Sequence, residues 1–305
     1  ERFLAEIANK GALDASLTVL RQQPFLQLSD GRVLIVDLQF ATDLVVSGVY
    51  WLLFDGLPKR HRDTFRELWG RCFELYVLGL LGEFYPVGSQ ILSTNIRHKT
   101  GEIDALLDFG SDVFIFEIKS SLLTLPAKRS GDPAALSADI DRKFVRDDAG
   151  DPKAVVQLAR AAQSIHAGSI PTTTTPTRIY PVLITDEPAC ECLGFNAYLD
   201  ERFQQEASDS TGIRPLTVMS INELEEALPY SATNVFSWAE LFETRFENTR
   251  VKIWSAHQAI YDLRHARKRD VCRNGYLLNR FEAIYQEMLR TYGATAALPP
   301  TLRNR

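Results

Sequence analysis

The sequence predicts a mixed β-sheet with helices packed on it, in the α/β (α+β) class. The apolar patterns between positions 61 and 187 follow the order helix, strand, strand, strand, helix, strand. Of the 305 residues, 45% are hydrophobic and 24% are charged, as in ordinary globular proteins. The pair Gly110-Ser111 joins two of the strand patterns and has the composition of a hairpin loop. A chain of this length can bury a substantial core.

The first 58 residues predict a small leader of helix, hairpin and helix. Residues 1–20 have helical spacing of apolar residues. Residues 24–38 alternate in a strand pattern on either side of Asp30-Gly31, which is a strong turn signal. A mixed apolar segment then runs to Phe54 and predicts a helix, which ends at the helix-breaking residues 56–58.

Residues 59–190 predict the central domain. Its expected elements are, in order, a helix over 61–81, a strand over 90–96, a hairpin over 101–121, a helix over 153–168 and a strand over 177–187. Between the hairpin and the second helix, residues 126–152 are rich in Pro, Gly, Asp and basic residues. This composition predicts a mobile insertion that contains a short helix around 137–145.

Residues 191–305 predict a mostly helical C-terminal extension. The expected helices lie near 196–207, 222–228, 237–246, 255–267 and 276–292, with one short strand at 215–219. We find no internal repeat in any of the three parts.

The hairpin over 101–121 carries charged residues among its isoleucines and phenylalanines. A two-residue loop at Gly110-Ser111 sets Asp104 directly opposite Glu117, with their Cβ atoms about 4.5–5.5 Å apart on one face. Lys119 lies two residues beyond Glu117 and therefore returns to that face. One alternative is an edge hairpin whose polar face is only hydrated. The apolar residues on both sides of Glu117 are more typical of a central strand, where an unpartnered carboxylate is very costly.

Two carboxylates directly opposite each other repel unless a cation lies between them. A divalent metal would resolve the repulsion, and hard oxygen ligands select Mg²⁺ or Mn²⁺. Such an ion suits phosphodiester hydrolysis, because it activates water and neutralises developing charge. Lys119 could orient the attacking water, deprotonate it or neutralise the phosphate, and spacing alone does not choose among these roles.

Asp104 followed by Glu117-Ile118-Lys119 resembles the D…ExK core of the PD-(D/E)xK nuclease superfamily, which has the restriction-endonuclease-like fold. The residues around this core, 101–103 before it and 120–121 after it, are similar to the RecB-like and Holliday-junction-resolvase-like branches. The element order from 61 to 187 also resembles the αβββαβ core of that family. The resemblance implies a Mg²⁺-dependent nuclease acting on DNA in restriction, phage defence or repair.

The resemblance also implies further site residues. The helix before the sheet often donates an acidic residue to the metal, and Glu74 matches best, with Glu83 or Glu67 as substitutes. Gln157 fits the first position of a Gln-based motif, although Ala161 stands where a Tyr is expected. The alternatives are that Glu74 is a polar residue of an amphipathic helix and that Gln157 is an exposed helical glutamine.

A net charge of -5 argues against a protein that coats nucleic acid through bulk charge. DNA contact would then depend on local basic clusters, or on a protein partner or homo-oligomer that delivers the substrate. A second hypothesis is a catalytically inactive member of the fold, used as a nucleic-acid or protein binding module. The candidate DNA contacts are Ser120, Arg97, Lys99, Arg267 and Lys268.

The four cysteines have no CxxC spacing and the apolar runs are too short to cross a bilayer. We therefore expect a cytoplasmic protein without a membrane partner. The sequence starts at Glu1, so a preceding targeting segment stays open. No zinc-ligand spacing and no GxxxxGK[ST] phosphate loop occurs.

Overall fold

The computed structural model describes residues 24–38, 40–41, 48–86, 91–99, 101–207, 211–247, 254–269 and 272–292. The chain divides into two compact units, Glu1–Trp69 and Gly70–Arg305. The helix expected over residues 1–20 lies outside the described residues. No described helix is long and apolar enough to cross a membrane.

The first unit contains the expected hairpin and helix. Strands β1 (Phe25–Gln27) and β2 (Val33–Ile35) pair antiparallel. Their turn contains Gly31 with a φ of 83°, a conformation that glycine adopts without steric cost. Helix α4 (Gly48–Gly56) follows and leads through a 3₁₀ turn, η1 (Lys59–His61), into α5 (Arg62–Phe84). The expected hairpin, the helix expected to end near residue 56 and the helix expected over 61–81 are therefore confirmed.

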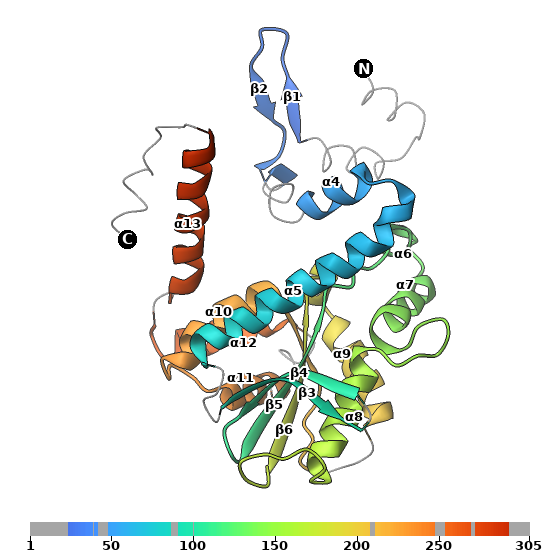
Figure 1. Ribbon diagram of the computed structural model, residues 1–305, viewed down its shortest axis with the longest axis vertical. Helices are drawn as coiled ribbons and strands as arrows, with labels where there is room; N and C mark the ends of the chain where they lie inside the picture. The colour runs from blue at the N-terminus through green and yellow to red at the C-terminus, as the bar shows by residue number, and fades with distance from the viewer. Residues whose placement is uncertain are drawn as a thin grey trace. The chain divides into compact units, whose positions relative to one another are not determined.

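The second unit is built on a mixed sheet with the strand order β3-β4-β5-β6-β7 among the described residues (Figure 1). Strands β3, β4 and β5 form an antiparallel meander, and β6 and β7 add parallel to β5. The observed order α5, β3, β4, β5, α8, β6 matches the expected order, which confirms the mixed α+β class. The strand bounds are Leu92–His98, Gly101–Asp108, Asp112–Lys119, Arg178–Thr185 and Thr217–Ser220.

Helices cover both faces of this sheet. The helices α10 (Ile221–Ala232), α11 (Trp238–Glu247) and α12 (Ala256–Ala266) supply buried side chains to one face, together with the second-unit part of α5. The helices α8 (Ala154–His166) and α9 (Phe195–Glu206) supply them to the other. Figure 1 shows the sheet between these two groups.

Strand β5 lies in the middle of the sheet and alternates between the two faces. Phe114, Phe116 and Ile118 belong to the core under α10 and α11. Val113 and Ile115 belong to the core under α8. Glu117 and Lys119 continue the spacing of Val113 and Ile115, so the period of two places them on the α8 face. The expectation of a central strand with one apolar and one partly charged face is confirmed.

The segment between β5 and α8 contains more helix than expected. It forms the helices α6 (Leu125–Arg129) and α7 (Pro133–Ile140), and α7 runs into a π-helical turn, η2 (Asp141–Val145). Ile140 and Phe144 are buried in the core under α8. The short helix expected around 137–145 is found as the end of α7 together with η2. The segment also holds a further helix, α6, and adds buried apolar side chains to that core.

The stretch expected as a C-terminal extension contributes to the core of the second unit. Strand β7 pairs with β6, and Trp238 and Phe242 from α11 pack on the side chains of β5. The last described helix is α13 (Gly275–Tyr292). The division into residues 1–58, 59–190 and 191–305 stays a prediction about domain organisation.

We predict that Phe116→Ala destabilises the protein by about 3–5 kcal/mol, because a fully buried ring on the central strand is replaced by a cavity. Urea unfolding followed by circular dichroism measures the change. Leu193→Ala is the control, since Leu193 is 61% exposed and its truncation is expected to change the free energy of unfolding by less than about 0.5 kcal/mol. Equal effects of the two substitutions would contradict the proposed core.

Candidate active site

The hairpin of β4 and β5 has the register that its loop predicts. Gly110 has a φ of 81°, and the N–H of Phe109 donates to the carbonyl of Asp112 at 2.9 Å. Ala105 lies opposite Phe116 four rungs further along the hairpin. Continued by one rung, this register would lead to Asp104 and Glu117, the pair that the sequence predicts.

The backbone ladder between β4 and β5 stops at the rung before these two acids. If the antiparallel alternation continued, the N–H of Ile118 would donate to the carbonyl of Ile103. It donates instead to Oδ2 of Asp104 at 2.7 Å. A side-chain carboxylate therefore replaces a strand carbonyl at this point, which holds the Asp104 carboxylate against the backbone next to Glu117.

Lys119 and Glu117 form a close ion pair on β5. Nζ of Lys119 lies 2.7 Å from Oε1 of Glu117, as strand periodicity predicts for residues two apart. Glu117 is only 3% exposed, whereas the side chain of Lys119 is 30% exposed. The carboxylate is thus buried and the ammonium reaches solvent, so the pair connects the core to the surface at the end of β5.

Burial raises the pKa of Glu117 to about 7, and the charge of Asp104 adds to the increase while Lys119 opposes it. Burial also raises the pKa of Asp104, against the opposing effects of Lys119 and the N–H of Ile118. Burial lowers the pKa of Lys119, but Glu117 and Asp104 together raise it above its ordinary value. The site therefore favours a charged lysine and disfavours two charged acids.

Glu74 acts on all three of these residues from helix α5. Its negative charge raises the pKa of Asp104, of Glu117 and of Lys119. The helix approaches β5 closely one turn earlier, where a Cβ added to Gly70 would lie 3.3 Å from Oγ of Ser120. Sequence reasoning selected Glu74 but missed Gly70, whose only signal was a glycine inside a helical pattern.

The other acids and the glutamine expected in the site have different surroundings. Glu83 is exposed near the end of α5, and Glu67 belongs to the first unit. Gln157 lies on α8, over the sheet face that carries Glu117. Its Oε1 is buried and accepts no hydrogen bond from the described residues. Ala161, where a Tyr was expected, is buried in the core beneath α8.

No group of three or more His, Cys, Asp or Glu residues within the described ranges is arranged to hold a metal ion. The acids that the structure brings together are Asp104 and Glu117, with Glu74 acting through its charge. Two carboxylates are the number that Mg²⁺ commonly takes from a protein. A direct ligand role for Glu74 stays a prediction.

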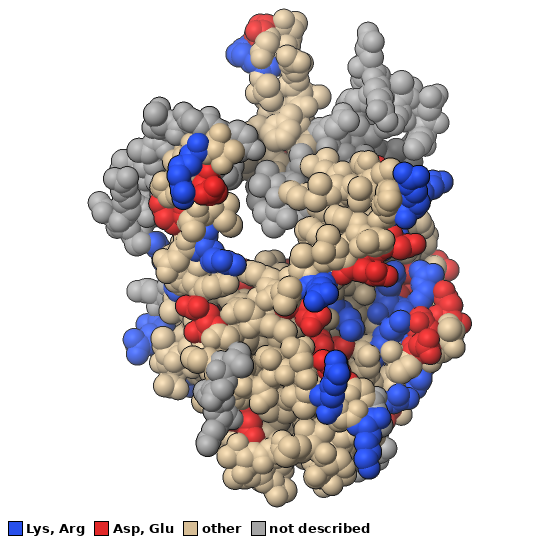
Figure 2. Space-filling model, viewed as in Figure 1, with Lys and Arg blue, Asp and Glu red and all other residues tan. Residues whose placement is uncertain are grey.

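Within the described residues, the ion pairs of the proposed basic contacts are with acids other than Asp104 and Glu117. Arg97 is exposed and lies 3.6 Å from Glu102, and Lys99 is exposed in the turn after β3. Figure 2 shows acidic and basic side chains intermixed on the visible face, without a broad basic field. On this face, local contacts would therefore have to supply any affinity for phosphate groups.

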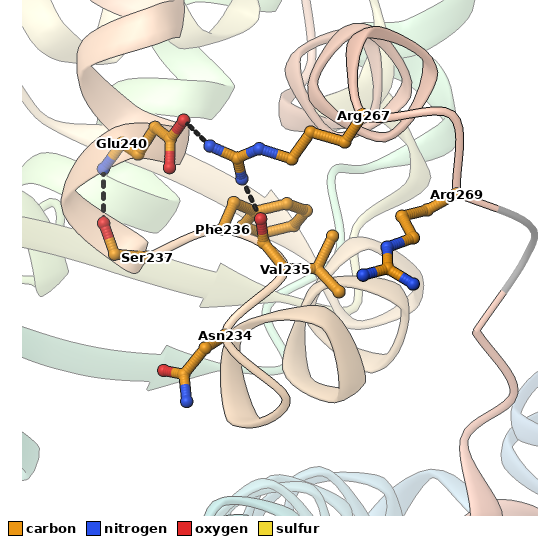
Figure 3. A pocket seen from close by; sticks show the side chains of 7 residues that line it. All are labelled: Asn234, Val235, Phe236, Ser237, Glu240, Arg267 and Arg269. Atoms are coloured by element: carbon orange, nitrogen blue, oxygen red, sulfur yellow. Dashed lines mark hydrogen bonds and ion pairs between the residues drawn. The ribbon is translucent and has the colours of Figure 1, made fainter.

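Arg267 and Lys268 lie where α12 ends. Arg267 donates to the carbonyl of Val235 and pairs with the carboxylate of Glu240, at the rim of a cavity of about 570 Å³ (Figure 3). Lys268 is exposed and has a φ of 52°. The charge of Arg267 is thus already balanced, which weakens its case as a DNA contact.

The pKa of Glu117 predicts a pH dependence of stability in metal-free protein. Its folded pKa of about 7 lies above the ordinary 4.5, so its contribution is fully present below 4.5 and is lost as the pH rises through 7. We expect the wild type to lose about 2–3 kcal/mol between pH 5 and pH 8 relative to Glu117→Gln. Urea unfolding in EDTA measures this difference, and identical pH profiles would contradict it.

No protein-family model matches the sequence, and no curated protein matches it either. Among solved structures, the small subunit of the heterodimeric restriction endonuclease R.BspD6I is similar at 11% identity, with a TM-score of 0.29. The match covers 64% of this chain and 88% of that chain. A similarity of this size does not establish a common fold, so the site described above stands on its own geometry.

Proposed function

We propose that this protein is a metal-dependent nuclease that hydrolyses phosphodiester bonds in DNA. The observation that supports it is the meeting of the Asp104 and Glu117 carboxylates with the Lys119 ammonium at the end of the central strand. These residue types, at this spacing, are those of the PD-(D/E)xK superfamily that the sequence resembles. Roles in restriction, phage defence or repair belong to the same proposal.

The electrostatics of the site support a divalent cation as its cofactor. Asp104, Glu117 and Glu74 carry acidic groups close to the ammonium of Lys119, and burial disfavours the charged form of the first two. Asp104 and Glu117 would hold Mg²⁺ or Mn²⁺, because a hard cation offsets this repulsion with oxygen ligands. The bound ion supplies activation of water and neutralisation of charge on the phosphodiester.

Lys119 is assigned to the substrate rather than to proton abstraction. Its pKa is raised by the surrounding carboxylates, so it stays protonated at neutral pH and has no free electron pair with which to act as a base. A partly exposed ammonium can neutralise a phosphate oxygen or orient a water molecule by donating hydrogen bonds. Ser120, the next residue, offers a hydroxyl at the same strand end.

Gln157 is assigned a supporting role in the same site. A buried acceptor without a partner is costly, and a water molecule bound at the site would satisfy it. The amide of Gln157 projects from α8, the helix that covers the face of β5 carrying Glu117. This unpaired acceptor supports assigning Gln157 to a bound water molecule or phosphate group.

A second candidate is the catalytically inactive binding module. The absence of any three-ligand acidic group in the described ranges, together with the close Lys119–Glu117 pair, favours it. The presence of all three residues of the motif, Asp104, Glu117 and Lys119, favours the nuclease. The experiment below separates the two.

Plasmid and linear DNA incubated with the protein should be cleaved in Mg²⁺ or Mn²⁺ and left intact in EDTA. We expect Asp104→Asn and Lys119→Ala to lower the cleavage rate by at least about 100-fold, since each removes charge from the reacting centre. Glu102→Gln is the matched control for Asp104→Asn. It removes the same charge from an exposed neighbour on β4 and should retain wild-type activity.

Metal binding gives a readout that does not need activity. Mg²⁺ should raise the melting temperature of the wild type and of Glu102→Gln, and should leave that of Asp104→Asn unchanged. Stabilisation by Mg²⁺ without cleavage of any DNA would favour the inactive module. A wild type that neither gains stability from Mg²⁺ or Mn²⁺ nor cleaves DNA would refute the metal site.

A further inference from the structure

Helix α13 is anchored at its start and exposed along its length. The N–H of Cys272 donates to the hydroxyl of Tyr230, and Nδ2 of Asn274 donates to the carbonyl of Glu225. Tyr276 packs partly against the core under α10. From Leu278 onward, the described side chains are exposed or only partly buried. Figure 1 shows α13 running away from α10 and α12.

The exposed part of α13 carries a continuous apolar stripe. Leu278, Phe281 and Ile284 are 47%, 57% and 60% exposed, which is unusual for three large apolar residues in succession on one helix. Leu277, Phe281 and Ile284 follow the spacing of four and three residues that marks a coiled-coil seam. In heptad terms Phe281 is at a, and Leu277 and Ile284 are at d. Position 288, a methionine in the sequence, is the next a.

The charges beside this stripe specify the direction of a partner helix. Arg280 and Glu287 both occupy g positions. In an antiparallel pair, the g positions of one helix face the g positions of the other. In a parallel pair, the g positions of one helix face the e positions of the other. When Phe281 meets Ile284 of an antiparallel second copy, Arg280 of each copy faces Glu287 of the other. Opposite charges therefore meet twice in such a pair.

The other flank of the stripe agrees with the same arrangement. Leu278 and Tyr285 occupy the two e positions, and they face each other across the antiparallel pair. A parallel pair would instead set Arg280 against Tyr285 and leave Glu287 without a cationic partner. Within one helix, Glu287 pairs with Arg290 at 3.1 Å, and Arg280 lies over the ring of Tyr276. Exposed contacts of this kind are weak, so they do not prevent exchange of partners.

We propose that α13 is a self-association element, through which two copies of this chain pair by antiparallel packing of their Phe281–Ile284 seams. The helix has 18 residues, so the interface is short. It is expected to lie at the weak end of specific protein interfaces, with dissociation in the micromolar range. The proposal does not rest on the nuclease function, because no residue of the acidic site takes part in it.

Light scattering after size-exclusion chromatography of the full chain tests the pairing, over loading concentrations from about 1 µM to about 200 µM. The wild type should pass from monomer to dimer in this range. Phe281→Glu with Ile284→Glu should stay monomeric. Its melting temperature should equal that of the wild type at concentrations where the wild type is monomeric, because both side chains are exposed. A wild type that stays monomeric throughout, or a dimer that survives this double substitution, would overturn the proposal.

A charge exchange tests the antiparallel register. Arg280→Glu sets like charges against each other twice in the proposed pair and should weaken dimerisation by at least about tenfold. The double variant Arg280→Glu with Glu287→Arg exchanges the partners and should restore the wild-type dissociation constant. If Arg280→Glu weakens pairing and the exchange does not restore it, the antiparallel register is wrong.

Discussion

The constraint on which the second unit depends is the burial of a carboxylate in its central strand. Glu117 lies between apolar neighbours and is almost fully excluded from water, a position that a charged side chain tolerates only with a close partner. Lys119 provides that partner from two residues away, and its ammonium stays partly in solvent. The strand can therefore pack on both faces and still present charge at one end.

The same constraint explains the local break in the sheet. Asp104 occupies the rung next to Glu117, and its carboxylate accepts the N–H of Ile118 that a strand carbonyl would otherwise accept. The backbone hydrogen bond is thus replaced rather than lost, which limits the cost of ending the ladder. As a result, the carboxylate of Asp104 is held near that of Glu117. The repulsion between them appears as raised pKa values at both, and a divalent cation would relieve it.

The two proposals concern separate parts of the second unit with different physical origins. The acidic site arises from polar groups that folding draws into the interior, where their interactions are strong. The α13 seam arises from apolar groups that folding leaves in water, which a second copy can cover. Each can hold or fail without the other.

Much of the acidic site was determined by the sequence alone. A two-residue glycine loop sets the hairpin register down to Ala105 opposite Phe116, and a period of two places Glu117 and Lys119 on one face of β5, because both rules act over short stretches of backbone. The order of helices and strands followed from local periodicity in the same way. Only the tertiary structure decided that the ladder ends at Ala105, that the segment after β5 adds side chains to the core under α8, and that Arg267 is already paired. These outcomes depend on contacts between residues far apart in the chain, which local patterns do not encode.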